Sequence, residues 1–222
     1  MNSFGTLFRI TLWGESHGPQ VGVTLDGVPA GLPLDIPDFE ADLARRRSGA
    51  KGTTPRKEND LPQIVSGLYN GMTTGAPLTI EFANRDTHSQ DYANVMRHYR
   101  PSHADMVAYH KFNGFNDPRG GGHFSGRITA ASVAAGTICE TVLNSLGIKV
   151  YTHIAECAGV KDAPLSSAAG LVMPAPQAGH FALLDPAKEE PMHWFSRSPA
   201  NSQSRVEAPC PSLSSARVRA FF

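Results

Sequence analysis

The first group of residues that could do chemistry is Gly-Glu-Ser-His-Gly at positions 14–18, which follows a predicted strand over 8–12. Glycines on both sides allow the backbone to approach a ligand closely. The imidazole of His17 could donate a proton to an anionic group or a leaving group near neutral pH. The cluster alone leaves a second interpretation open, in which His17 is an ordinary loop histidine that faces solvent.

The second group is a run of cations. Six positive charges fall within 13 residues: Arg45, Arg46, Arg47, Lys51, Arg56 and Lys57. Guanidinium groups bind phosphate and carboxylate through paired N–H donors, which suits a polyanionic ligand. A solvated basic loop is the alternative interpretation. Nucleic-acid binding through 45–57 is a more distant one, because no aromatic residue interleaves the run.

The third group comes in two pieces, Arg-Pro-Ser-His-Ala-Asp at 100–105 and Asp-Pro-Arg-Gly-Gly-Gly-His-Phe-Ser-Gly-Arg at 117–127. The glycine run leads into a helix predicted over 125–146. Exposed N–H groups at a helix N-terminus bind anions. A glycine-rich loop is a weak signal by itself, but together with Arg119, Ser125 and Arg127 it favours a phosphate-bearing ligand.

The elements that must position these groups follow from hydrophobic periodicity. Strands are predicted over 8–12, 21–25, 64–68, 78–82 and 148–154, and helices over 38–47 and 125–146. Small residues in the second helix allow close packing. The polar region over 84–123 is predicted to be irregular, which is unusual in a compact domain unless the region is functional. No repeated βαβ unit of a nucleotide-binding sheet is visible.

Composition excludes several classes of function. The 222 residues carry 20 Lys and Arg against 20 Asp and Glu, so neither nucleic acid nor an anionic membrane is indicated as a partner. The nine histidines show no HExxH or paired His/Cys spacing, so no metal site is expected. No GxSxG motif of a serine hydrolase is present. Three dispersed cysteines and no apolar run of about 20 residues favour a reducing cytoplasm.

The last 29 residues differ from the rest. The segment over 194–222 holds seven serines, three prolines, four arginines and one glutamate, without strand or helix periodicity. Such a composition is typical of a disordered segment.

Four of these motifs together resemble one family, chorismate synthase, and the resemblance extends over about residues 3–193. The motifs occur in the family's order and spacing: 14–18 followed by Asp-Gly-Val-Pro at 26–29, Asp-Leu-Ala-Arg-Arg-Arg-Ser-Gly at 42–49, Tyr-Arg-Pro-Ser-His-Ala-Asp at 99–105, and 120–127 running into Ala-Ala-Gly at 134–136. Ser102 stands where glycine is commoner in the family.

The resemblance implies an activity, the 1,4-elimination of phosphate from 5-enolpyruvylshikimate 3-phosphate that gives chorismate, the last step of the shikimate pathway. The reaction requires reduced FMN, and NADPH is a possible reductant. His17 would protonate the leaving phosphate, and His103 would lie near the flavin. His123, Phe124, Ser125, Arg127, Arg46 and Lys51 would bind the cofactor. Arg45, Arg46, Arg100 and Arg119 would bind the substrate anions.

The resemblance also implies a fold and an assembly. The expected fold is α+β, with helices sandwiched between antiparallel β-sheets, in a homotetramer. Because members of the family are typically much longer, residues 1–193 are expected to be an incomplete domain and 194–222 an aberrant tail, from a shifted reading frame or a similar event. The alternative to an active enzyme is an inactive truncated fragment without stable flavin binding.

Overall fold

The computed structural model describes residues 2–47, 58–86, 98–101, 103–157, 159–164, 180–192 and 219–221. The chain divides into two compact units. The first consists of Met1–Ser48 and Pro55–Val142, and the second of Gly49–Thr54 and Leu143–Phe222. Within the described residues no helix has both the length and the apolar character needed to span a membrane.

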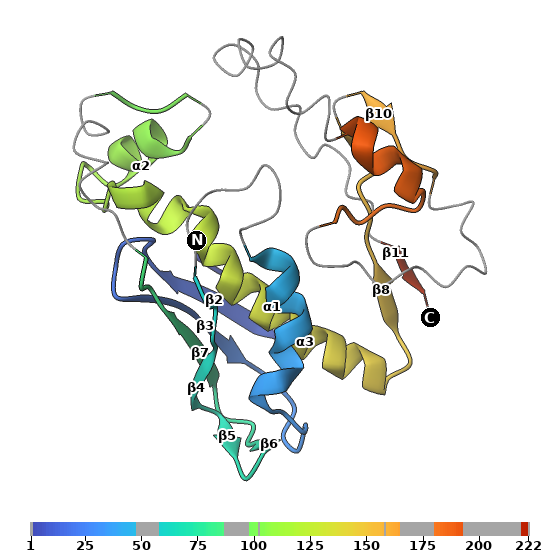
Figure 1. The fold of residues 1–222 in the computed structure, drawn as a ribbon. Helices are drawn as coiled ribbons and strands as arrows, with labels where there is room; N and C mark the ends of the chain where they lie inside the picture. The colour runs from blue at the N-terminus through green and yellow to red at the C-terminus, as the bar shows by residue number, and fades with distance from the viewer. Residues whose placement is uncertain are drawn as a thin grey trace. The chain divides into compact units, whose positions relative to one another are not determined.

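The first unit is built on a five-stranded antiparallel sheet (Figure 1). Its order is β1 (Ser3–Phe4), β2 (Arg9–Gly14), β3 (Gln20–Asp26), β7 (Leu78–Ala83) and β4 (Gln63–Ser66). Alternate residues of β7 are buried, as expected for a sheet with one covered face. The predicted strands over 64–68 and 78–82 are neighbours in this sheet, because β4 and β7 pair antiparallel with Ile64 opposite Ile80.

A small hairpin lies between β4 and β7 in the sequence. Strands β5 (Leu68–Tyr69) and β6 (Met72–Thr73) pair across Asn70 and Gly71. Both turn residues have positive φ, 48° and 74°. A two-residue hairpin turn of this twist favours Asn-Gly because both positions require the left-handed region.

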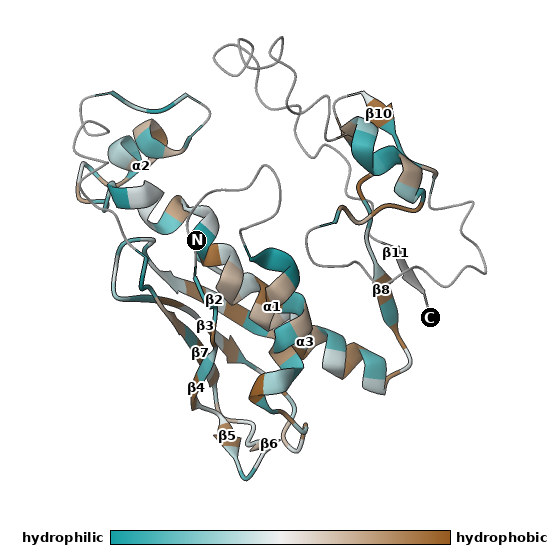
Figure 2. Ribbon diagram, in the orientation of Figure 1, coloured by the Kyte–Doolittle hydropathy of each residue, from teal (hydrophilic) through white to brown (hydrophobic). Residues whose placement is uncertain are grey.

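Two helical segments cover one face of the sheet (Figure 1). The short 3₁₀ turn η1 (Ile36–Phe39) leads into α1 (Glu40–Arg46), and Asp35 caps the turn through a reciprocal pair of hydrogen bonds with Asp38. Helix α3 (Thr129–Ser145) presents alanines to the core. Figure 2 shows hydrophobic residues along the strands, α1 and α3.

The buried core of this unit joins the sheet to both helices. Its members are Ile10, Val21, Val23, Leu25, Val28, Leu34, Phe39, Leu43, Leu78, Ile80, Phe82, Ile128, Ala130, Ala131, Ala134, Ala135 and Ile138. The periodicity of 125–146 is thereby confirmed, because its small residues form the packed face of α3. Their size lets the α3 backbone approach the sheet closely.

The predicted α+β class is confirmed, but some boundaries differ from the prediction. The helix expected from residue 125 begins as the 3₁₀ turn η4 (Gly126–Ile128), after a looser turn η3 (Arg119–Phe124). Helix α2 (Asp105–Lys111) lies in the region predicted to be irregular. Only Asp105 and Ala108 of α2 are buried, so no apolar stripe marks this helix in the sequence.

The second unit contains short strands and a buried contact between a histidine and an aspartate. It contains β8 (Lys149–Tyr151), β9 (Glu156–Cys157), β10 (Val160–Lys161), the 3₁₀ turn η6 (Pro186–Lys188) and β11 (Arg219–Phe221). His153 Nδ1 and Asp162 Oδ2 are 2.9 Å apart and both side chains are buried. Burial raises the pKa of Asp162, but hydrogen bonds from the Leu184 amide and His153 outweigh it and leave the pKa below its ordinary value.

Strand β11 is the part of 194–222 that the structure describes, and it pairs antiparallel with β8. The rest of the predicted tail lies outside the described residues. The boundary at residue 193 and the origin of the tail therefore stay predictions.

Replacing Phe82 by alanine tests the role of the core. Phe82 is fully buried between the sheet and its helices, so Phe82→Ala is expected to lower the free energy of unfolding by about 3–5 kcal/mol. The control is Phe115→Ala, because Phe115 is 92% exposed and its loss should change the unfolding free energy by less than about 0.5 kcal/mol. Chemical denaturation measures both. Equal effects of the two substitutions would contradict the assignment of the core.

Candidate functional site

A turn of three glycines forms the centre of the candidate site. Gly120, Gly121 and Gly122 have φ values of 62°, 85° and 57°, all in the region that side chains disfavour. The turn lies directly before the segment that leads into α3. Gly121 and Gly122 are buried. The sequence signal of the glycine run therefore corresponds to a backbone that other residues could not adopt without strain.

The two predicted catalytic histidines meet at this turn. A Cβ placed on Gly120 would lie 2.5 Å from His17 Cδ2, and one placed on Gly121 would lie 3.2 Å from His103 Cε1. The imidazoles therefore contact neighbouring residues of the same turn, although they come from distant parts of the sequence. The absence of glycine side chains makes room for both rings.

The loop that carries His17 is tied to the glycine turn by two hydrogen bonds. The amide of Ser16 donates to the carbonyl of Gly122 at 3.0 Å. His123 Nδ1 lies 2.9 Å from the carbonyl oxygen of Gly14. Because a carbonyl only accepts, Nδ1 of His123 carries a proton in this contact. Hydrogen bonds thus join the loop at 14–18 to the segment at 120–123, and the two segments position each other.

His103 is held beside a charge pair. Arg100 donates to both carboxylate oxygens of Asp105, from Nη2 at 2.7 Å and from Nε at 2.8 Å. The side-chain hydrogen bond from Arg100 holds the pKa of Asp105 below its ordinary value. Arg100 Nη2 also lies 3.3 Å from His103 Nδ1. Since a guanidinium only donates, Nδ1 accepts here, and a neutral His103 ring carries its proton on Nε2.

A second charge pair lies at the start of the glycine turn. Arg119 donates to both oxygens of Asp117, at 2.9 and 2.8 Å. This hydrogen bonding lowers the pKa of Asp117 and raises that of Arg119, and the charge of His17 further lowers the pKa of Asp117. About half of the Arg119 side chain is exposed, so the guanidinium can still reach a ligand.

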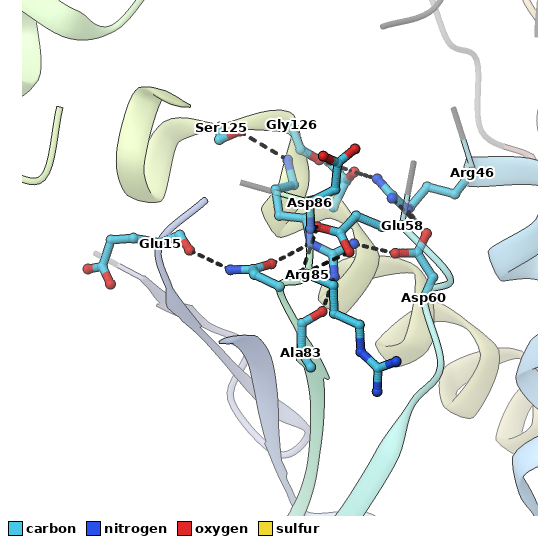
Figure 3. A network of polar contacts seen from close by, with 12 residues as sticks. Glu15, Arg46, Glu58, Asp60, Ala83, Arg85, Asp86, Ser125 and Gly126 are labelled. Carbon is cyan, nitrogen blue, oxygen red and sulfur yellow. Dashed lines mark hydrogen bonds and ion pairs between the residues drawn. The ribbon is translucent and has the colours of Figure 1, made fainter. Parts of the chain in front are cut away.

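Arg46 and Arg127 both bind a buried carboxylate, Asp60 (Figure 3). Arg46 donates to Asp60 Oδ2 from Nη2 at 2.7 Å and from Nε at 3.2 Å. Arg127 donates from Nη1 to Oδ1 of the same carboxylate. The side chains of Asp60 and Arg127 are 0% and 2% exposed. The remaining Arg127 nitrogens donate to Asn84 Oδ1 at 2.8 Å and to the Ala83 carbonyl at 3.1 Å.

The other predicted binding residues lie in different surroundings. Arg45 is 44% exposed and bridges to Asp42 on its own helix at 3.2 Å. The hydroxyl of Ser125 caps η4 by accepting from the amide of Arg127. Phe124 is 41% exposed and its ring packs near that of Phe112. Lys51 lies outside the described residues.

The structure brings together seven of the predicted residues around the glycine turn and adds partners that sequence reasoning missed. The seven are His17, His103, Arg100, Arg119, His123, Phe124 and Ser125. The missed residues are Asp60, Asn84, Asp105 and Asp117. Asp105 and Asp117 stand inside motifs already noticed, but Asp60 ends a polar stretch in which an acidic residue is ordinarily solvated.

The arrangement can transfer protons and bind anions. Two imidazoles face one turn, one of them beside a carboxylate, and the half-exposed guanidinium of Arg119 lies at the start of the turn. Within the described part of the chain, no three His, Cys, Asp or Glu side chains gather as a metal site would require.

Gly120→Ala tests the close approach of His17. The added methyl group would meet the imidazole at a positive φ, so the variant should lose about 1–3 kcal/mol of unfolding free energy and shift the ring resonances of His17 in NMR spectra. Gly136→Ala is the matched control. Gly136 lies within α3 with open space around it, and the change should stabilise the helix by about 0.5–1 kcal/mol. An unshifted His17 resonance in Gly120→Ala would refute the contact.

The Arg100–Asp105 pair predicts a pH-dependent stability. The pKa of Asp105 is lower in the folded state, so its ion pair stabilises the protein fully above the ordinary aspartate pKa of about 4 and is lost as the pH falls further. The difference in unfolding free energy between wild type and Asp105→Asn should therefore be largest near pH 7 and shrink below about pH 4. In an Arg100→Leu background the same difference should be smaller. A difference that does not change with pH would contradict the ion pair.

Comparisons with known proteins agree on one family. The family model for chorismate synthase matches residues 8–206. A chorismate synthase of Chitinophaga pinensis is 58% identical over 163 residues, which cover 73% of this chain and 49% of that protein. One from Dehalococcoides mccartyi is 48% identical over 160 residues, which cover 72% of this chain and 44% of the relative.

A crystal structure of chorismate synthase matches with a TM-score of 0.43 and 27% identity, covering 67% of this chain and 37% of the other. The chain thus spans about half the length of the curated relatives it matches. The extent of the family match and the level of identity lead to one conclusion: the chain belongs to the chorismate synthase family.

Proposed function

We propose that this chain takes part in the chorismate synthase reaction, the elimination of phosphate from 5-enolpyruvylshikimate 3-phosphate to give chorismate. Membership of the family supports the proposal. The single observation that carries it is the meeting of His17 and His103 at the Gly120–Gly121 backbone. A proton donor for the leaving group and a second imidazole for the cofactor are thus available at one place.

His17 acts as the proton donor to the departing phosphate. It lies close enough to Asp117 for its charge to lower the pKa of that carboxyl. An imidazolium offers both electrostatic attraction to a phosphate dianion and a proton to the leaving oxygen. The substrate's phosphate and two carboxylates need cationic partners, and Arg45 and Arg119 are each nearly half exposed. Arg100 and Arg46 complete the proposed set of substrate contacts.

Reduced FMN fits the residues around the glycine turn. The half-exposed ring of Phe124 lies next to the glycine turn and offers a surface for a planar aromatic group. When bound, the reduced flavin supplies electron density to the allylic system of the substrate. His123, Phe124 and Ser125 would hold the cofactor, and the Nε2 proton of a neutral His103 is available to donate to it.

The same proposal includes further properties that the chain would share with the family. They are a homotetrameric assembly, a cytoplasmic location, and the absence of nucleic-acid and membrane partners. NADPH would serve as reductant, with Arg46 and Lys51 near it. Residues 1–193 would form the family domain and 194–222 a separate tail.

Anaerobic assay with reduced FMN and 5-enolpyruvylshikimate 3-phosphate tests the proposal directly. The chain should release phosphate and form chorismate, measured by its absorbance. His17→Ala and His103→Ala should each lower turnover by a factor of about 10² or more, because each removes a group that moves or holds a proton at the reacting centre.

His180→Ala is the matched control, since His180 belongs to the second unit, is 60% exposed and has its Nδ1 2.9 Å from Glu189 Oε2. This variant should keep the activity of the wild type. A folded chain that forms no chorismate, or two active-site variants that turn over like wild type, would refute the proposal. The first of these results would favour an inactive fragment.

A further inference from the structure

We propose that Asn84 is a positioning residue for His17, and that the buried Asp60–Arg127 pair fixes the orientation of its amide. The structural part of this inference stands on the contacts alone. Its consequence for turnover rests on the proposed function of His17. Arg127 then acts on the site through Asn84, by a route that needs no direct contact with a cofactor.

Asn84 clamps both ends of the turn that carries His17. Its Nδ2 donates to the carbonyl of Glu15 at 3.0 Å and to the carbonyl of Gly18 at 2.8 Å. The backbone N–H of Asn84 donates to the carbonyl of Pro19 at 3.0 Å. Three carbonyls of one short loop are therefore bound by a single residue at the end of β7. His17 lies between the two that the side chain holds.

The orientation of the Asn84 amide is determined by its neighbours. Arg127 Nε donates to Asn84 Oδ1 at 2.8 Å, and a guanidinium has no acceptor. The oxygen must therefore face Arg127, and the NH₂ group must face the two loop carbonyls, which only accept. An amide rotated by 180° would place donor against donor and acceptor against acceptor. No other side chain of this length offers one acceptor and two donors in this geometry.

Arg127 is itself fixed by Asp60. The carboxylate binds Nη1 of Arg127 through one oxygen and the guanidinium of Arg46 through the other. Figure 3 shows the contacts that run from Arg46 through Asp60 to Ala83 and the backbone of Glu15. Arg46 ends α1 and Arg127 precedes α3. The contacts therefore transmit the packing of both helices to the loop of His17.

The position of His17 depends on this clamp because the fit of its ring is close. The space between His17 and the Gly120 backbone would not admit a methyl group, since a Cβ there would lie 2.7 Å from Nε2. A loosened 15–18 turn would move the proton-carrying nitrogen relative to the glycine turn. Proton transfer is sensitive to such displacements, because the donor must stay within hydrogen-bond reach of the acceptor.

Asn84→Asp is the sharpest test, because it keeps the size and the acceptor for Arg127 but removes both donors to the loop. Histidine ring resonances of the ¹⁵N-labelled 222-residue chain are the first readout, with His17 assigned by its loss in His17→Gln. Hydrogen exchange of the Gly18 amide, which donates to Glu15 within the turn, is the second. We expect a shifted His17 resonance and at least ten-fold faster exchange of Gly18, with the His180 resonance unchanged.

Asn144→Asp is the matched control, since Asn144 is an exposed residue of α3 and its replacement should alter neither readout. Asn84→Ser serves as a second variant that adds no charge, and it should reproduce the shift if the aspartate variant does not fold. Asp60→Asn should shift the same His17 resonance through Arg127. Unchanged His17 and Gly18 signals in a folded Asn84 variant would overturn the proposal.

Kinetics separate this inference from the function on which it partly rests. If the chain forms chorismate, Asn84→Asp should lower kcat at least ten-fold with less than a three-fold change in KM, because the clamp positions a proton donor and not the substrate-binding arginines. An increase in KM as large as the decrease in kcat would contradict a positioning role. If the wild type forms no chorismate, the proposed function fails, while the NMR and exchange results still decide whether Asn84 positions His17.

Discussion

The buried carboxylate of Asp60, bound by two arginines, is the interaction on which the site of the first unit depends. A charge removed from water is strongly destabilising unless it is paired and hydrogen-bonded. Arg46 and Arg127 satisfy both oxygens of Asp60, and the backbone of Asp60 adopts a positive φ of 48° to place it there. The first unit therefore reaches its native packing only when α1 and the segment before α3 lie close enough for Arg46 and Arg127 to bind the same carboxylate.

That requirement joins the packing of the core to the geometry of the site. Ile128 and Ala130 flank the start of α3 and are buried against the sheet, while Arg127 beside them reaches Asp60 and Asn84. A displacement of α3 along the sheet would therefore be transmitted to the loop at 14–18. The glycine turn contacts the same loop through other hydrogen bonds. Its carbonyl at Gly122 and the ring of His123 bind the same loop, so the His17 loop is held from two sides.

Much of the sheet and both covering helices were predictable because local sequence and tertiary packing favour the same conformation. The alternation in β3 and β7 and the alanine periodicity of α3 each match the face that is buried. Helix α2 was not predictable, because it buries too little apolar surface to leave a pattern. The 3₁₀ entry into α3 was missed for a related reason. The glycines and Ser125 indicate a turn followed by a helix, but not the residue at which regular hydrogen bonding begins.

The sequence by itself determined the family, the chemical character of the site and the residues at its centre, since His17, His103 and the glycine run are recognisable from residue type and spacing. Only the tertiary structure decided how much of each cation is exposed and which carboxylate it binds. Arg45 and Arg119 lie half exposed, whereas Arg46 and Arg127, indistinguishable from them in the sequence, bind Asp60. The physical reason is that burial and ion pairing depend on contacts between residues distant in the chain. No local pattern encodes which carboxylate a given arginine will meet.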